Sequence, residues 1–280
     1  MSDPGFRSFI LNALAEDTGS GDHSSLASIT PSVTGRARLL VKESGIIAGL
    51  SVARDIFSIT DPSLETELLI KDGDSVKYGD IALTVAGSVH SILRAERLVL
   101  NVMQRMSGIA TATATYVERV SGTRARITDT RKTTPGMRAL EKEAVRLGGG
   151  VNHRMGLYDM IMLKDNHIDY AGGIAVAVKR TQEYLIRQNL PLRIEVESRS
   201  IDEVMEILAV GGVDRIMLDN FDIPNTRKAV ELIGDRAETE SSGGITLANV
   251  REYALCGVDY ISIGALTHHI KSLDMSLKAY

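Results

Sequence analysis

The sequence predicts an α/β protein in two parts, a small α+β domain followed by an incomplete (β/α) barrel with six recognisable parallel strands. Two observations support the barrel: short apolar runs alternate with helical patterns after residue 108, and polar or glycine residues follow each apolar run. A third observation, short strand-like runs broken by glycine turns before residue 108, indicates the α+β part.

Composition is that of an ordinary globular protein. The chain has 280 residues, of which 44% are apolar and 24% are charged, and its net charge is −4. This negative charge argues against non-specific binding to nucleic acid or anionic membranes. One cysteine, Cys256, stands among apolar neighbours, so we expect a buried thiol in a reducing compartment. No signal peptide or membrane span is recognisable, and we expect a soluble, cytoplasmic protein.

The first part, residues 1–108, contains strand-like runs and one long helical pattern. The pattern covers about residues 88–120, and Gly108 is predicted to interrupt it and to mark a domain boundary or a kink. The strand-like runs are separated by turn signals such as Asp72-Gly73-Asp74, and they cover residues 36–42, 46–49, 68–71 and 81–86.

The second part, residues 109–266, alternates strand and helix. Glycines such as Gly211 and Gly257 stand where helices should end. Helical patterns cover residues 173–188, 201–209, 225–233 and 247–256. The six buried strands are predicted at residues 125–130, 160–164, 192–197, 215–219, 237–240 and 260–263.

Polar groups gather at the carboxyl ends of these strands. They are Thr130-Arg131-Lys132, Lys164, Glu197, Asp219, residues 241–244 and Gly264. Both a (β/α) barrel and an open doubly wound sheet bind ligands at that edge. The absence of a dinucleotide-binding fingerprint favours the barrel.

Several cations stand near the predicted strand ends, and for a single one of them an exposed basic surface is the simpler interpretation. Because Arg131, Lys132 and Lys164 follow separate strands at one edge, however, they predict an anionic substrate with several charges. The complete set is Arg97, Arg131, Lys132, Arg154 and Lys164, with His153 beside them.

Glu197 and Asp219 end consecutive predicted strands. Such carboxylates can bind ribose hydroxyls or hold Mg²⁺, directly or through water. Salt bridges to the neighbouring cations are the competing interpretation, and a carboxylate pair alone would also suit a glycosidase. The surrounding cations favour a phosphate-bearing substrate.

Two glycine-containing loops follow the last two strands. Residues 241–246 read Ser-Ser-Gly-Gly-Ile-Thr, and Ile263-Gly264-Ala265 ends the next strand. Glycine allows close approach of the backbone, and a following helix N-terminus offers free N–H groups to an anion. The pair indicates a phosphate site late in the barrel.

Taken in order, the motifs resemble those of the quinolinate phosphoribosyltransferase (nicotinate-nucleotide pyrophosphorylase, carboxylating) family over nearly the whole chain. A small departure is Ser24, where members often have threonine. The motifs are residues 16–22, 95–97, 107–111, 130–138, 152–157, 163–167, 195–197, 218–220, 242–245 and 263–267.

This resemblance implies an N-terminal open sandwich, onto which a C-terminal tail of residues 267–280 packs, and an incomplete (β/α) barrel of about six or seven parallel strands. It implies transfer of phosphoribosyl from phosphoribosyl pyrophosphate to quinolinate with decarboxylation, giving nicotinate mononucleotide, pyrophosphate and CO₂ in NAD biosynthesis. It also implies a homodimer in which Arg97 crosses the interface.

Residue roles follow from the same resemblance. The quinolinate carboxylates would meet Arg97, Arg131, His153, Arg154, Lys132 and Lys164, beside Thr130. Ser242, Gly243 and Gly244, with Ile263, Gly264 and Ala265, would bind the 5′-phosphate. Lys132, Lys164, Glu197 and Asp219 would form the catalytic set, with Mg²⁺ held by Glu197 and Asp219.

Three rival functions remain open. The first is that of a relative acting on another pyridine or base, such as the paralogous proteins encoded with molybdate transporters. The number of cations favours an acid with two carboxylates over a mono-acid, which would leave buried positive charge unpaired. The second is a non-catalytic phosphate-binding barrel, and the third is a glycosidase or aldolase barrel.

Overall fold

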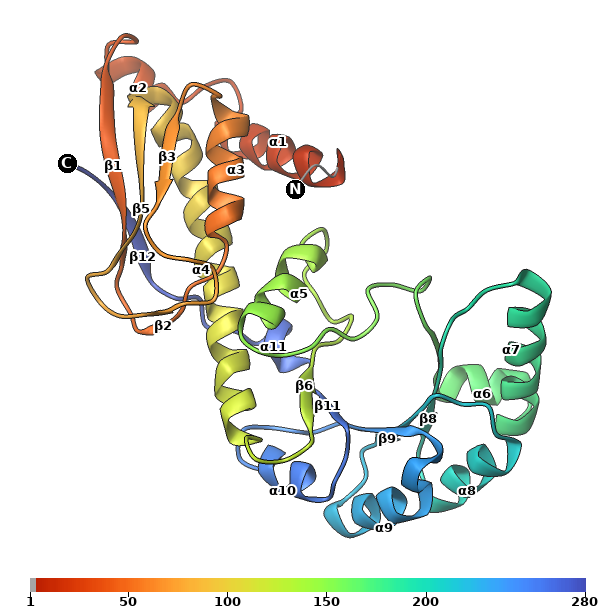
Figure 1. Ribbon diagram of the computed structural model, residues 1–280. Coiled ribbons are helices and arrows are strands. Elements are labelled where there is room, and N and C mark those ends of the chain that lie inside the picture. The colour runs from red at the N-terminus through yellow and green to blue at the C-terminus, as the bar shows by residue number, and fades with distance from the viewer. Residues whose placement is uncertain (1–3) are drawn as a thin grey trace. The chain divides into compact units, whose positions relative to one another are not determined.

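The computed structural model describes residues 4–280, and these residues divide into two compact units (Figure 1). The first unit ends at Ala114 and also takes in Thr134–Gly149 and His269–Tyr280. The second unit contains Thr115–Thr133 and Gly150–His268. Residues 134–149, which the sequence analysis assigned to the barrel, therefore group with the first unit. No described helix is long and apolar enough to cross a membrane.

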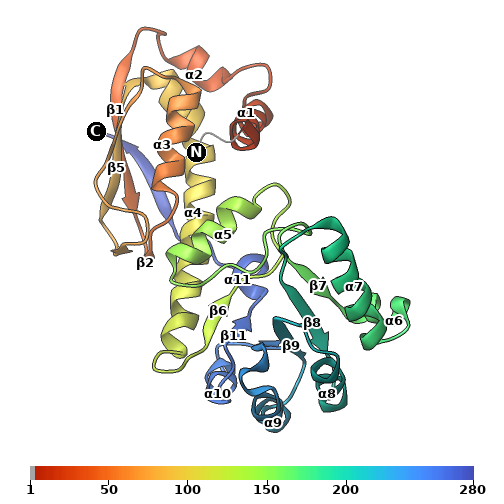
Figure 2. The ribbon, with the colours of Figure 1, turned by 45° about the vertical axis from the view of Figure 1, so that its right-hand side comes forward.

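The first unit is built on a four-stranded antiparallel sheet in the order β12-β1-β5-β3. Figures 1 and 2 show α3 and the first half of α4 on one face of this sheet. The strands are β1 (Thr34–Val41), β3 (Glu65–Leu68), β5 (Ile81–Ser88) and β12 (Met275–Ala279), and β2 (Gly45–Ile46) pairs with β4 (Ser75–Val76). The helices are α1 (Pro4–Thr18), α2 (His23–Ser28), α3 (Leu50–Thr60), α4 (Val89–Arg119) and α5 (Arg138–Leu147).

The C-terminal segment supplies an edge strand of this sheet. β12 pairs antiparallel with β1, from Met275 opposite Val41 to Ala279 opposite Ala37. Alternate residues of β1, such as Leu39 and Val41, are buried against the helices, which is the period-2 pattern of a sheet with one covered face.

Gly108 does not interrupt the long helix, so that prediction is wrong. α4 continues through it to Arg119. A Cβ at position 108 would lie 3.0 Å from Cα of Ser272 and closer still to the carbonyl oxygen of Lys271. The glycine is therefore explained by close backbone packing in the first unit, because any side chain would push the 271–272 segment away.

Two predicted strands of the first part are also displaced. The run at 68–71 shares only Leu68 with the observed strand β3 (Glu65–Leu68), because Lys71 N donates to Asp74 Oδ2 at 3.0 Å and closes a turn there. The run at 46–49 keeps only its first residue in β2, and Gly49 instead precedes α3 with a φ of 97°.

The second unit is the predicted barrel, and its six parallel strands have the order β6-β11-β10-β9-β8-β7. Val151 forms an isolated parallel bridge with Thr128 of β6, at the place where a seventh barrel strand would lie. The strands are β6 (Arg126–Thr128), β7 (Ile161–Leu163), β8 (Ile194–Ser198), β9 (Arg215–Asp219), β10 (Glu238–Ser242) and β11 (Tyr260–Ser262). All six coincide with predicted runs to within a few residues.

Helices line the outside of this barrel (Figure 2). Ser200 caps α8 by accepting a hydrogen bond from Glu203 N, and Gly211 ends the same helix as predicted. Cys256 follows α10 and is buried, also as predicted. The helices are α6 (Asp165–Ala171), α7 (Ile174–Gln188), α8 (Ile201–Val210), α9 (Ile223–Ile233, followed by the 3₁₀ turn Gly234–Arg236), α10 (Val250–Leu255) and α11 (Ala265–His268).

Candidate active site

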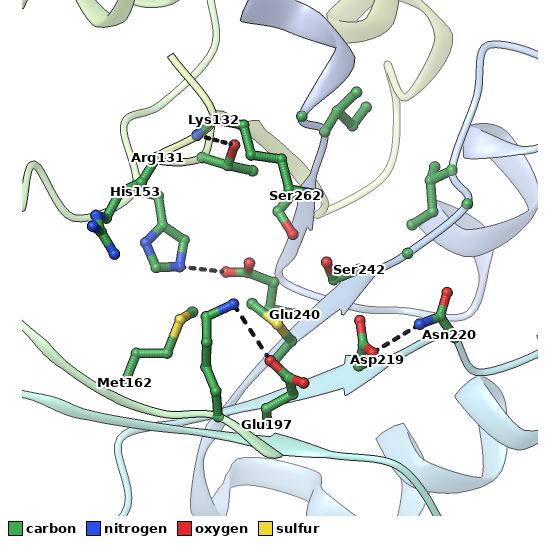
Figure 3. A pocket seen from close by; sticks show the side chains of 18 of the residues that line it. Arg131, Lys132, His153, Met162, Glu197, Asp219, Asn220, Glu240, Ser242 and Ser262 are labelled. Carbon is green, nitrogen blue, oxygen red and sulfur yellow. Dashed lines mark hydrogen bonds and ion pairs between the residues drawn. The ribbon is translucent and has the colours of Figure 1, made fainter. Parts of the chain in front are cut away.

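A cavity of about 790 Å³ lies at the carboxyl ends of the barrel strands (Figure 3). The structure brings together in its lining every predicted site residue of the second unit. These are Thr130, Arg131, Lys132, His153, Arg154, Lys164, Glu197, Asp219, Ser242, Gly243, Gly244, Ile263, Gly264 and Ala265. Arg97 is not among the lining residues; it is an exposed residue of α4 in the first unit.

The loop after β6 holds Arg131 and Lys132 at the cavity wall. Lys132 N donates to Thr130 Oγ1 at 3.0 Å, and Lys132 O accepts from Thr267 Oγ1 at 2.8 Å. Both bonds fix the backbone of Lys132 and leave its ammonium group to the cavity. Lys164, the residue directly after β7, lines the same cavity.

Arg154 is a buried cation of this wall, with 8% of its surface exposed. Its Nη1 donates to the carbonyl oxygen of Met160 at 3.2 Å. Burial, followed by the positive charge of Arg131, lowers the pKa of Arg154. Because a guanidinium stays protonated in proteins, the two arginines form a site that an anion would stabilise.

Glu197 and Asp219 face the cavity from adjacent strands, β8 and β9. Burial and then the charge of Asp219 raise the pKa of Glu197. Lys164 Nζ lies 3.7 Å from Glu197 Oε2, so the salt bridge of the competing interpretation is present in this structure. Two repelling carboxylates with oxygen donors fit Mg²⁺, which commonly uses one or two carboxylates and completes its shell with water and substrate phosphates.

The glycine loop after β10 is shaped by Asn220. Asn220 has a φ of 56°, its N donates to Ser242 O at 2.8 Å, and its Nδ2 donates to Asp219 Oδ2 at 2.7 Å. Gly243 and Gly244 have φ values of 91° and 62°, in the left-handed region that favours glycine. The loop therefore exposes backbone at the cavity rather than side chains.

Gly264, at the end of the next strand, is equally confined. A Cβ there would lie 3.0 Å from His268 Nε2 and 3.1 Å from Lys132 Cδ. The backbone of two neighbouring loops thus borders the cavity where the sequence predicted a phosphate site.

The sequence analysis missed several lining residues, of which Glu240 is the most notable because it is fully buried. The others include Met162, Met217, Asn220 and Ser262. A signal was available: alternate residues of a strand face the same side, and Glu240, Met217 and Ser262 each stand two positions before a predicted site residue.

Comparison with known protein families agrees with this geometry. The model of the quinolinate phosphoribosyl transferase N-terminal domain matches residues 22–107, and that of the C-terminal domain matches residues 109–278. The chain belongs to the quinolinate phosphoribosyltransferase family.

Individual members of the family are similar over almost the full chain. The chloroplastic nicotinate-nucleotide pyrophosphorylase (carboxylating) of Arabidopsis thaliana is 48% identical over 97% of this chain and 82% of its own length. Quinolinate phosphoribosyltransferase (decarboxylating) 1 of Nicotiana glauca is 47% identical over 95% of this chain and 80% of its own length. The crystal structure of NadC from Streptococcus pyogenes superposes with a TM-score of 0.91 at 40% identity, covering 98% and 96% of the two chains.

Proposed function

We propose that this quinolinate phosphoribosyltransferase family member transfers phosphoribosyl from phosphoribosyl pyrophosphate to quinolinate, releasing pyrophosphate and CO₂ and giving nicotinate mononucleotide. The observation that supports this most directly is the composition of one cavity. Four arginine and lysine cations, four carboxylates that include Glu197 and Asp219, and two glycine loops line it together. The relatives named above are a nicotinate-nucleotide pyrophosphorylase (carboxylating) and a quinolinate phosphoribosyltransferase (decarboxylating), and the cavity supplies the groups that the substrates of such a reaction need.

The acid binds at the cationic wall. Arg131 and Arg154 present planar guanidinium groups that match carboxylate oxygens, and Lys132 and Lys164 add point charges. Arg154 is buried, so leaving its charge unmatched would cost free energy. Quinolinate has two carboxylates and therefore neutralises this wall better than a mono-acid does.

Phosphoribosyl pyrophosphate binds on the other side of the cavity. The 5′-phosphate meets Ser242 and the backbone of Gly243, Gly244 and Gly264, and the ribose hydroxyls bind Glu197 and Asp219. Magnesium, held at Glu197 and Asp219 directly or through water, supplies positive charge to the diphosphate when bound.

Charge and position then explain the chemistry. The bond between ribose C1 and the diphosphate oxygen breaks, and its electron pair leaves with pyrophosphate, which Lys132 and Lys164 stabilise. The pyridine nitrogen forms the new bond to C1. The positively charged ring draws the electrons of the C2–carboxylate bond, CO₂ leaves, and C2 takes a proton. The residues orient and neutralise the reactants, and no covalent nucleophile is needed.

Two further features belong to this proposal. The protein acts as a homodimer in which Arg97 completes the acid-binding wall of the partner's cavity. It works in the cytoplasm, as the single buried cysteine suggests.

The test is direct. Purified protein is incubated with phosphoribosyl pyrophosphate, Mg²⁺ and quinolinate carrying ¹⁴C in its 2-carboxylate, and nicotinate mononucleotide and ¹⁴CO₂ are measured. We expect both products in equal amounts. Absence of both would overturn the proposal, and product formed from nicotinate but not from quinolinate would assign the protein to a relative of different specificity.

A further inference from the structure

Two glutamates inside the barrel lie against His153. Glu195 on β8 and Glu240 on β10 are both fully buried. Glu195 Oε2 lies 3.0 Å from His153 Nε2, and Glu240 Oε2 lies 3.5 Å from the same nitrogen. Figure 3 shows the contact between His153 and Glu240 at the cavity wall.

Two buried carboxylates are unfavourable if their only role is to fill space in the fold. Burying a carboxylate costs several kcal/mol unless partners compensate it, and apolar side chains would fill the same space at lower cost. Glu240 is compensated by Arg215, whose Nη1 donates to Oε2 at 2.8 Å. Within residues 4–280, neither oxygen of Glu195 has a well-aligned hydrogen-bond partner. Its Oε2 lies close to His153 Nε2, and Arg215 and then Arg154 are the cations that most offset its charge.

The other contacts of His153 determine which ring nitrogen carries the proton. Nδ1 accepts a hydrogen bond from the backbone N of Arg154 at 2.8 Å. A neutral imidazole has one accepting and one donating nitrogen, so its proton is then on Nε2. The backbone N of His153 donates to Asp129 Oδ1 at 3.0 Å, which fixes the residue from a third direction.

The same three side chains have the composition of a metal site, because their ligand atoms lie within 4.8 Å of one another. A metal would need the lone pair of His153 Nε2, but the bond from Arg154 N to Nδ1 leaves the proton on Nε2. Arg215 also occupies an oxygen of Glu240 that a metal would use. The contacts favour two acceptors facing one N–H donor.

We propose that Glu195 and Glu240 are positioning residues that hold the His153 ring as its Nε2–H tautomer, fixed as a wall of the acid-binding part of the cavity beside Arg154. The inference rests on the proposed function for the identity of the acid. A ring held in this way meets the acid as a neutral, rigid surface. The positive charge that binds the acid then comes from the arginines and lysines.

The test replaces each glutamate by glutamine, which keeps an oxygen acceptor, and by leucine, which keeps the volume and removes the acceptor. Glu238→Gln is the matched control. Glu238 is on β10, the strand of Glu240, and it also accepts a hydrogen bond from Arg215, at 3.1 Å, but it has no contact with His153. We expect Glu195→Leu and Glu240→Leu to raise KM for quinolinate by about tenfold or more through misorientation, with KM for phosphoribosyl pyrophosphate within about twofold of wild type. Glu195→Gln, Glu240→Gln and Glu238→Gln should stay close to wild type.

A second measurement keeps the inference independent of turnover. Ring ¹⁵N signals of His153, assigned by their loss in His153→Gln, should show a bare Nδ1 and a protonated Nε2 in the wild type, and a tautomer mixture in the leucine variants. A protonated Nδ1 in the wild type would overturn the inference. So would leucine variants with unchanged KM values, or a stoichiometric Mn²⁺ or Zn²⁺ ion that the glutamine variants lose. If the wild type shows no activity with quinolinate, the proposed function fails while this tautomer test still decides the positioning role.

Discussion

The side chain of Asn220 occupies the space that a side chain at position 243 would need. A Cβ on residue 243 would lie 2.5 Å from Asn220 Cγ, well inside van der Waals contact. Asn220 in turn holds Asp219 through its Nδ2 and the loop through its N. One asparagine thus connects the proposed ribose carboxylate to the proposed phosphate loop.

Gly243→Ala should therefore impair binding of phosphoribosyl pyrophosphate more than Gly244→Ala does. Both glycines have a positive φ, which costs a residue with a Cβ about 1–2 kcal/mol. Only position 243 adds a clash, because nothing lies within 4 Å of a Cβ at position 244. KM values for phosphoribosyl pyrophosphate would measure the difference. Asn220 has a φ of 56°, so glycine is the replacement that removes its side chain without backbone strain. The Gly243→Ala/Asn220→Gly double variant should be more stable than Gly243→Ala, and a double variant as unstable as Gly243→Ala alone would contradict the steric explanation.

Arg131→Ala and Lys164→Ala should lose turnover while the fold survives. Neither side chain is in the buried core, and Lys164 is about half exposed with a single 3.7 Å ion pair. We expect a decrease in kcat/KM of at least about a hundredfold, as for removal of one electrostatic contact to a developing charge. Circular dichroism should be unchanged. Retained activity in either variant would remove that residue from the proposed site.

The pH dependence of stability should reveal the buried Glu240. Burial, and then the charge of Glu195, raise the pKa of Glu240 from an ordinary 4.5 to about 7. The folded state therefore binds the proton more tightly than the unfolded state, so the free energy of unfolding should fall as pH rises from about 4.5 to about 7.

Glu240→Gln should flatten this slope by up to about 1.4 kcal/mol per pH unit, the value for one proton. Urea unfolding at several pH values would measure it, with Glu238→Gln as the control. The pKa of Glu238 is lowered, and its partly exposed carboxylate lies outside the cavity lining. An unchanged slope in Glu240→Gln would contradict a raised pKa for this residue.

Gly108→Ala tests the packing that replaced the predicted helix break. In an exposed helix, changing glycine to alanine stabilises by about 1 kcal/mol. Here the new methyl group would meet the backbone of residues 271–272, and overpacking of this kind costs about 1–3 kcal/mol. We therefore expect a net decrease in stability by urea unfolding. An increase in stability would show that residues 271–272 can shift to make room for the methyl group at little cost in free energy.

Most barrel strands were predictable because they are short, largely apolar runs followed by a functional group, and the local sequence pattern determines both. β10 is polar throughout (Glu-Thr-Glu-Ser-Ser), and only its place in the regular alternation of strands and helices indicates it. The helix α3 was not predicted because its first turn is capped from a distance. The backbone N of Leu50 and that of Ser51 donate to Asp72, more than twenty residues later in the chain. No local sequence signal encodes such a cap.

The sequence analysis identified the site residues that stand at the ends of strands, but it missed those that lie within the strands, deeper in the barrel. Asp219 and Ser242 stand at strand ends, whereas Glu195 and Glu240 lie inside their strands. The close contact of these two glutamates with His153 depends on the parallel register of the barrel and on the 153 loop together. Strand alternation indicates which residues face the barrel interior. Neither composition nor periodicity predicts the strand register together with the position of the 153 loop, so neither predicts this contact.

The role proposed for Arg97 leads to a test by complementation. Arg97→Ala and Lys164→Ala subunits, co-expressed with different tags and purified as the mixed dimer, each lack one proposed site residue. If Arg97 acts in the partner's cavity, one cavity of the mixed dimer contains both defects and the other contains neither. We then expect about half of wild-type activity from the mixed dimer, although each single-variant homodimer is inactive, because one of two symmetric sites is restored.

A mixed dimer of Arg131→Ala and Lys164→Ala is the matched control, since both residues line the same subunit's cavity and every site then has one defect. Activity in the control, or none in the Arg97→Ala mixture, would contradict a shared site.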